Sequence, residues 1–190
     1  MKTFKLDLTA SEKQQLKQKG IKINCLSEYA ADEISALLNT DKQRADELAA
    51  LITFQSIPSI GPKFAHDLIS LGYYSIDDLL DKDAPTLFNE LERKQGFWTD
   101  PCVEDQFWLV VHYAKHRGSN KNWWDFTAER KVYRAKHGYP SDRPATAWHE
   151  EPEVKSHESR TKSQEKKKLF SLTNIIAKLL FLFLILVLDS

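Results

Sequence analysis

The hydrophobic residues of this chain recur at helical spacing in a series of segments, each bounded by capping or breaking residues. Residues 9–12 have the pattern of a capping box that opens a helix to about Lys19, and Gly20 ends it. Residues 40–43 have the same pattern and open the longest clear amphipathic helix. No segment shows sustained alternation of apolar and polar residues, so we expect helices and no sheet.

Shorter patterns predict helices between and after these two. A helical turn is expected over residues 26–29, and Asp32 is expected to cap the short helix that follows. Asp83 is expected to cap a helix that Gly96 ends. Residues 100–101 place a cap, and then a proline at the first helical position, before another apolar helix face.

The order of these predicted elements repeats along the chain. Residues 16–20 and then Leu26 match residues 68–72 and then Leu79. Each unit runs from a helix that ends in glycine through a short helix, a helix and a turn to a capped helix. Two glycine-terminated segments can also match by chance, and this alternative stays open. With the repeat, we predict an all-α domain of five or six helices over residues 6–137.

Residues 57–65, Ile-Pro-Ser-Ile-Gly-Pro-Lys-Phe-Ala, join two predicted helices through a tight turn. Pro62 suits the first helical position, and Gly61 allows close backbone approach and a positive φ. Unpaired amide N–H groups at a helix N-terminus form a generic anion site, and Lys63 stands beside this one. The residues predicted to bind a phosphate are Ser59, Ile60, Gly61, Pro62 and Lys63.

This stretch resembles a helix-hairpin-helix motif, whose usual pattern is apolar-Pro-Gly-apolar-Gly-x-x-x-Ala. The resemblance implies that the hairpin amides bind a phosphate of duplex DNA without reading its sequence. Ser59 stands where the motif has its first glycine, and this difference bears on how closely a phosphate can approach. Together with the repeat, the resemblance implies a tandem helix-hairpin-helix (SAM-like) domain.

Composition narrows the class of protein only in part. The chain has 190 residues and no net charge, so overall basicity gives no sign of a nucleic-acid partner. Cys25 and Cys102 are too few for a disulfide framework and lack the spacing of metal ligands. No apolar run follows the first lysines, so we expect no secretory signal and a cytoplasmic location.

The charges are nevertheless segregated, and residues 116–137 form a basic extension rich in aromatic side chains. The residues predicted to make further phosphate or base contacts are Lys115, Arg117, Lys121, Trp123, Trp124, Arg130, Lys131 and Arg134. The tryptophans could stack on bases of a single strand, or they could pack on the domain. We favour packing for at least one of them, which leaves the basic residues for phosphate.

No motif predicts an enzyme, a cofactor or a metal site. His112 and His116 are four residues apart on a helix, but without a third ligand we expect a satisfied surface pair. Cys102 near a helix N-terminus is expected to pack rather than react. The acidic residues of segment 76–92 are expected to be helix caps and a solvated face, which should point away from any bound DNA.

The C-terminal part has a different character. Residues 138–168 lack periodicity and become basic, which predicts a disordered linker. Residues 169–188 are nearly all apolar and match the length of a membrane span, although Asn174 and Lys178 interrupt them. We predict an apolar helix that is either a C-terminal membrane anchor, with the domain on the cytoplasmic face of the inner membrane, or an interfacial or non-inserting tail.

Four segments carry a more specific resemblance, namely residues 54–63, 71–79, 95–103 and 122–126. They are similar to the pathogenicity-locus (mitomycin-resistance-like) family of small bacterial helix-hairpin-helix proteins. The resemblance covers residues 6–129 and not the linker or the tail. It implies a DNA-binding fold, with a possible relation to DNA repair or drug resistance, and no defined reaction.

Two functional hypotheses follow. The first is a protein that binds DNA without sequence specificity through the predicted turn, helped by the basic extension. The second is a protein-interaction or adaptor module held at the membrane by its tail, with an unknown protein partner. The zero net charge, the acidic segment and the missing first glycine favour the second hypothesis.

Overall fold

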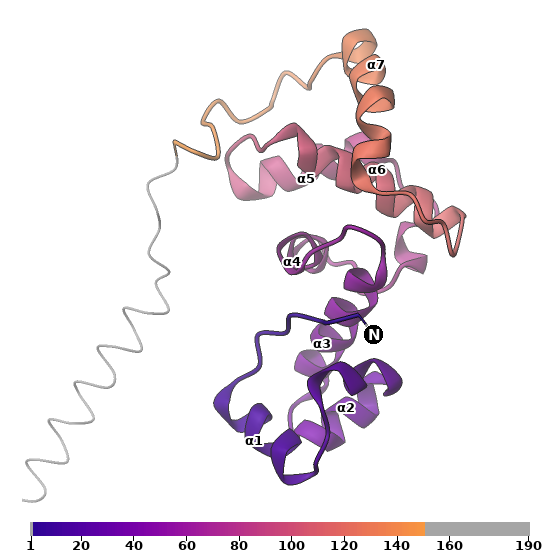
Figure 1. Cartoon of the computed structure of the whole chain (residues 1–190). Coiled ribbons are helices and arrows are strands. Elements are labelled where there is room, and N and C mark those ends of the chain that lie inside the picture. The colour runs from indigo at the N-terminus through magenta and orange to yellow at the C-terminus, as the bar shows by residue number, and fades with distance from the viewer. Residues whose placement is uncertain (1, 151–190) are drawn as a thin grey trace, which may run out of the picture. The chain divides into compact units, whose positions relative to one another are not determined.

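The structure is a computed structural model that describes residues 2–150. This part of the chain holds seven α-helices and three short 3-10 helices (Figure 1). The α-helices are α1 (Ala10–Gln18), α2 (Ala31–Leu38), α3 (Lys42–Ser56), α4 (Pro62–Ser70), α5 (Ala84–Gln95), α6 (Pro101–Lys115) and α7 (Thr127–His137). The 3-10 helices are η1 (Ile23–Glu28), η2 (Asp77–Leu79) and η3 (Trp123–Phe126).

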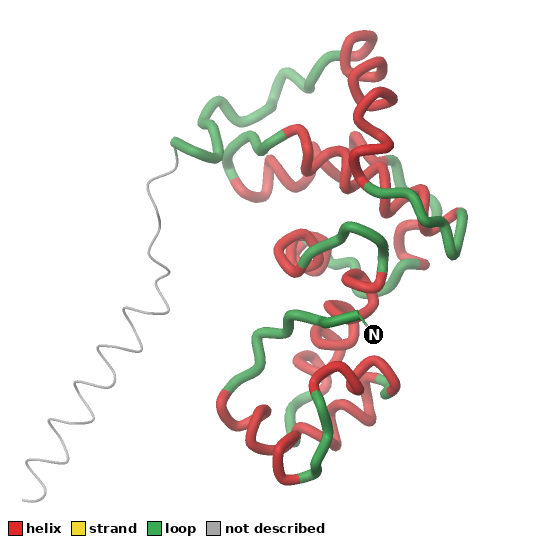
Figure 2. The backbone as a smooth tube through the Cα atoms, viewed as in Figure 1, coloured by secondary structure: helices red, strands yellow, loops and turns green. Residues whose placement is uncertain are grey.

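The all-α prediction is confirmed for residues 2–150, where Figure 2 shows helices and loops and no strand. The order helix, 3-10 helix, helix, helix occurs twice, first as α1, η1, α2, α3 and again as α4, η2, α5, α6. This is the order of elements that the repeat predicts. Extended pairing in the described part is limited to an isolated parallel bridge between Trp98 and Ala147.

Several predicted helix caps are present. Thr9 forms the expected capping box with Glu12 at the start of α1. Asp83 and Asp100 accept hydrogen bonds from the first turns of α5 and α6, as expected. Because each cap joins residues that are close in sequence, the local pattern was sufficient to find it.

Two caps differ from the prediction. Asp32 lies inside α2, and the Glu33 carboxylate instead accepts a hydrogen bond of 2.7 Å from the Ala30 N–H. At α3 the cap is the Asp41 side chain, which accepts from the Arg44 N–H at 2.8 Å. Both differences move the helix start by one or two residues, a displacement that local sequence patterns do not resolve.

The core runs through both repeats and contains a cluster of aromatic rings. The ring of Phe107 on α6 meets Phe64 of α4 edge-on, with centroids 4.8 Å apart, and lies 6.5 Å from Phe88 of α5. Phe88 and Phe107 are fully buried. Burial of side chains of this size contributes about 1.5–3 kcal/mol each, so these rings hold α4 against the α5–α6 pair.

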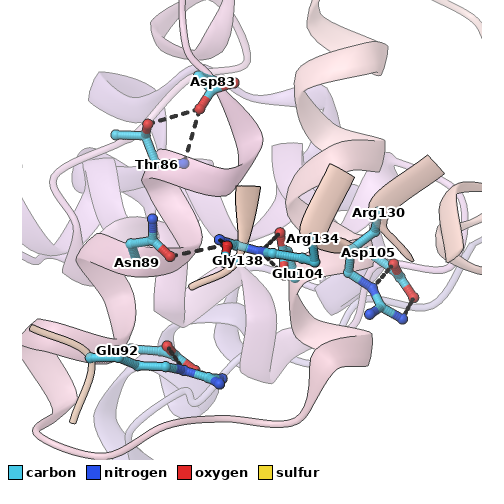
Figure 3. A network of polar contacts seen from close by, with 10 residues as sticks. Asp83, Thr86, Asn89, Glu92, Glu104, Asp105, Arg130, Arg134 and Gly138 are labelled. Atoms are coloured by element: carbon cyan, nitrogen blue, oxygen red, sulfur yellow. Dashed lines mark hydrogen bonds and ion pairs between the residues drawn. The ribbon is translucent and has the colours of Figure 1, made fainter. Parts of the chain in front are cut away.

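Buried ion pairs fasten α7 to α6 (Figure 3). Arg130 donates to Asp105 at 2.5 Å, and Arg134 donates to Glu104 at 2.8 Å. Both carboxylates are completely buried. Arg134 also donates to the Asn89 side chain at 3.0 Å, so it joins α7 to α5 as well.

The unit that contains these helices continues to His149, beyond the domain end predicted at residue 137. Arg143 donates two hydrogen bonds of 2.7 Å to the buried Glu92 carboxylate. The Trp98 N–H donates to the Thr146 carbonyl, and the Trp148 N–H donates back to the Trp98 carbonyl. Residues 139–148, named here the strap, are therefore bonded to the α5–α6 connection rather than being a free linker.

Residues 151–168 of the predicted linker lie outside the described residues. The predicted apolar helix at residues 169–188 lies outside them too, so its relation to a membrane stays a prediction. Within residues 2–150, no helix has the length and apolar character that crossing a membrane requires.

Candidate functional site

The predicted phosphate-binding turn lies between α3 and α4. Its two isoleucines, Ile57 and Ile60, are buried and fix the turn to the core. The Ile57 carbonyl accepts a hydrogen bond of 2.8 Å from the Lys2 ammonium group, so the N-terminal segment also contacts this turn. The positive φ occurs at Ser59, at 55°, whereas Gly61 has a φ of −100°. Gly61 therefore does not use the positive φ that a glycine allows, and Ser59 has it instead.

Ser59 connects the turn to the tryptophan segment. Its hydroxyl oxygen accepts a hydrogen bond of 3.1 Å from the N–H of Trp123 at the start of η3. The Trp123 side chain is half-buried against the core, while the neighbouring Trp124 is 53% exposed. The prediction that at least one of these tryptophans packs is confirmed by Trp123, and the structure brings the two predicted site segments together.

The N-terminus of α4 is open. No side chain among residues 2–150 caps it, and its first backbone bond of 3.1 Å runs from the Ala65 N–H to the Gly61 carbonyl. By helical geometry, the amides of Lys63 and Phe64 have no acceptor inside α4. Apart from its two chain neighbours, a Cβ added to Gly61 would meet no described atom within 4 Å, so a side chain has room at this position.

Some basic residues predicted for the site are available to an external anion. Lys63, Lys115, Lys121 and Lys131 are exposed. The Lys121 ammonium group lies 5.1 Å from the centre of the Phe126 ring in η3. Lys121 therefore belongs to the segment that Ser59 holds against the turn.

The predicted arginines are in ion pairs. Arg130 and Arg134 face Asp105 and Glu104 in the buried pairs described above, so they do not form the expected phosphate patch. Burial raises the pKa of Glu104, although the Arg134 guanidinium opposes this. Arg117 is half-exposed and pairs with Asp77. Arg130 and Arg134 are thus used inside the fold, whereas the exposed Arg117–Asp77 pair contributes little to stability. The exposed lysines remain available to an external anion.

Several acidic residues of segment 76–92 act as caps, as expected, or pair with arginines, but the buried Glu92 does not belong to the expected solvated face. The Asp78 carboxylate accepts from the amides of Tyr74 and Ser75 at 2.9 and 2.8 Å. Partial burial raises the pKa of Asp78, but these two hydrogen bonds bring it below its ordinary value. Glu92 is buried and paired with Arg143. In residues 2–150 no cluster of His, Cys, Asp and Glu side chains could hold a metal ion.

The histidine pair forms a small surface cluster. The rings of His112 and His116 lie 4.5 Å apart, and His112 Nε2 is 3.2 Å from the Ser119 hydroxyl. Burial, the positive Lys121 and His116 lower the pKa of His112. Cys102 differs from the expected packing residue, because it is exposed. Partial desolvation of its sulfur and a hydrogen bond with Asp100 raise the pKa of Cys102, which disfavours the thiolate.

One comparison with known proteins gives a match. Residues 47–132 match Cdd1, the pathogenicity-locus family. The Cdd1 match begins within α3 and ends within α7, so it includes the α3–α4 turn, η3 and the Asp105–Arg130 pair. It supports the family resemblance found in the sequence. No curated protein and no solved structure matches the chain.

A pocket of about 220 Å³ that the sequence did not predict lies next to the turn. Lys63 and Asp67 of α4 line one part of it, and Gln95 and Phe97 line another. Trp148 of the strap, which lies outside the Cdd1 match, also lines it. No sequence pattern links these residues, because they come from three segments that only the folded chain brings together.

Proposed function

We propose that this protein binds DNA through the α3–α4 turn, without sequence specificity, as a tandem helix-hairpin-helix domain. The observation that carries the proposal is the hydrogen bond between the Ser59 hydroxyl and the Trp123 N–H. It joins the segment that carries the exposed Trp124 and Lys121 to the turn that precedes α4, which supports the proposal. Positive charge, an aromatic surface and free amides are the groups with which proteins hold a nucleic-acid backbone and its bases.

The mechanism assigns a separate role to each group. The amides of Lys63 and Phe64 donate to a phosphate oxygen, and the Lys63 ammonium group adds charge. Lys121 contacts a neighbouring phosphate, and Trp124 stacks on a base wherever the strands are open. Because the chain has no net charge, the attraction is local, and we expect weak binding that falls steeply with added salt.

The test is Gly61→Asp, assayed by binding to a short duplex at several salt concentrations. The new carboxylate would cap α4 and occupy the phosphate position, so we expect at least about a tenfold loss of affinity. Thermal unfolding should be unchanged or slightly raised, because the structure has space for the side chain and Asp is a good N-cap. Equal affinity of Gly61→Asp and wild type would contradict the proposal.

A matched control is Asn39→Asp. This substitution also adds one negative charge, at a residue with a φ of 51° that Asp tolerates, between α2 and α3. We expect the affinity for the duplex to fall by less than about twofold, because Asn39 is not part of the proposed contact and exposed charges are screened. If both variants weaken binding equally, the effect is one of net charge and not of the turn.

A second candidate function, a protein-interaction module, has its own observation. A groove of about 460 Å³ on the N-terminal part has apolar walls that include Phe4, Leu16 and Ile23, and Lys13, Lys17 and Lys22 also line it. An acidic peptide with apolar side chains would fit this chemistry. If the wild type shows no salt-dependent binding to duplex or branched DNA, this second function becomes the better proposal.

The membrane anchor is a further proposal, independent of both functions. It rests on the length and apolar composition of residues 169–188. Cell fractionation should place the full chain with membranes and a chain cut after Lys168 in the soluble fraction. Recovery of both chains in the same fraction would rule the anchor out.

A further inference from the structure

The pocket beside the turn has a polar side that is not fully satisfied. The Gln95 side-chain N–H donates to an Asp67 carboxylate oxygen at 3.3 Å. The other end of the amide, Gln95 Oε1, is buried and has no hydrogen-bond partner among the described residues. A buried acceptor without a partner is uncommon in folded proteins and calls for an explanation, such as a ligand.

The Asp67 carboxylate is a hydrogen-bond acceptor in a partly desolvated environment. Burial raises the pKa of Asp67, while the positive charges of Lys63 and His66 oppose the increase. An ionised carboxylate that has lost much of its water gains from a ligand that donates two parallel hydrogen bonds. Asp67 and Gln95 together offer more acceptors than donors, so they favour a ligand rich in N–H groups.

The other sides of the pocket suit a flat ring. The Phe97 ring lines it, and so does Trp148, which is 47% exposed although it is a large apolar residue. The strap holds Trp148 in place through its backbone bond to Trp98. Aromatic walls around a few directed polar groups are the usual surroundings of a stacked base.

We propose that this pocket receives one unpaired base of a bound DNA, and that it prefers guanine. Guanine presents N1–H and N2–H₂ side by side, which matches the two oxygens of the Asp67 carboxylate, and a remaining amino hydrogen is directed toward the Gln95 amide. Thymine offers a single N–H on that edge. The inference rests on the proposed function, because Lys63 belongs both to the phosphate contact and to the pocket.

The experiment uses the full chain and a set of otherwise identical duplexes with one unpaired nucleotide, which is guanine, cytosine, adenine or thymine. We expect the guanine duplex to bind about tenfold more tightly than the thymine duplex, the size of one good bidentate contact. Asp67→Asn should bring this ratio close to one. Asp32→Asn, the same charge change on an exposed residue of α2, should keep the wild-type ratio.

A second measurement separates the pocket from the proposed function. Guanosine, added without DNA, should shift the NMR signal of the Trp148 indole N–H more than thymidine does, and Asp67→Asn should remove the difference. If Gly61→Asp weakens binding to every duplex while all four bases bind alike, the DNA site is supported and the pocket is refuted. If no duplex binds but guanosine shifts Trp148, the pocket is supported and the DNA site is refuted.

Two further outcomes overturn the inference. A guanine preference that survives in Asp67→Asn would place base recognition elsewhere. If N-acetyl-arginine amide shifts the Trp148 signal and guanosine does not, the pocket takes a cationic protein side chain. The signal of Trp148 can be assigned by its disappearance in Trp148→Phe, since the chain has five tryptophans.

Discussion

At the scale of single residues, Ser59 determines both the backbone conformation of the turn and its contact with η3. It has the left-handed conformation that the first glycine of the hairpin motif would adopt without strain. For a residue with a side chain this conformation costs about 1–2 kcal/mol. In return the hydroxyl accepts the Trp123 N–H, which a glycine cannot do. The serine that replaces the first glycine of the motif therefore also makes a contact between the turn and η3.

Backbone strain and the hydrogen bond at Ser59 oppose each other, so two substitutions there should change the free energy of unfolding differently. Ser59→Ala keeps the strain and loses the hydrogen bond, so we expect the free energy of unfolding to fall by about 0.5–1.5 kcal/mol. Ser59→Gly loses the same bond but relieves the strain, so its stability should stay close to wild type. Chemical denaturation measures both values.

Hydrogen exchange gives an independent check on the same bond. The Trp123 amide should exchange faster in both variants, because neither side chain can accept its hydrogen bond. Unchanged exchange in both would show that the Ser59–Trp123 bond does not hold η3. The sequence predicted a turn here from Pro62 and the apolar pattern, but a contact across 64 positions leaves no local signal.

At the scale of elements, the attachment of α7 depends on charge buried between helices. Asp105 and Arg130 lie 25 positions apart, and both side chains are almost inaccessible to solvent. In the sequence, Arg130 resembles its exposed neighbour Lys131, so the charge pattern predicts a phosphate contact for both. A charge pattern does not distinguish a surface charge from a buried charge whose partner is distant in sequence. The caps at Thr9 and Asp83 could be predicted because each cap joins residues that are neighbours in sequence.

The buried pair predicts unequal effects of two adjacent substitutions. Arg130→Ala leaves Asp105 buried without its partner, which should lower the free energy of unfolding by about 3–5 kcal/mol. Lys131→Ala removes an exposed charge and should change it by less than about 0.5 kcal/mol. Thermal and urea unfolding of the two variants make the comparison. A loss below about 1 kcal/mol for Arg130→Ala would mean that water reaches Asp105.

At the scale of the whole unit, the strap explains why the domain end was misplaced. The strap residues 139–148 contain prolines and charges and lack a period, which favours a linker. Their attachment depends on Arg143, which reaches a buried carboxylate and lies 3.7 Å from the centre of the Tyr139 ring. Helices α1 to α6, their order and the turn could be predicted because they have local signals, whereas the segment that forms α7 is predicted only as part of a basic extension. The pocket could not, because Trp148 reaches it only through the strap.

Arg143→Ala should therefore detach the strap from the α5–α6 connection. Glu92 would keep its bond from the Thr99 N–H but lose the guanidinium, so we expect a loss of about 3–5 kcal/mol in the free energy of unfolding. Arg93 is a matched control, because its pair with Asp142 is exposed and Arg93→Ala should cost less than about 1 kcal/mol.

The position of the strap can be followed separately from global stability. In Arg143→Ala, under conditions where the helices remain folded, the Trp148 indole signal should move toward its position in a random coil, and guanosine should no longer shift it. If the Trp148 signal stays in place while stability falls, the backbone bonds to Trp98 hold the strap without Arg143. The pocket would then depend on the Trp98–Ala147 bridge, and its integrity would be independent of the Glu92 ion pair.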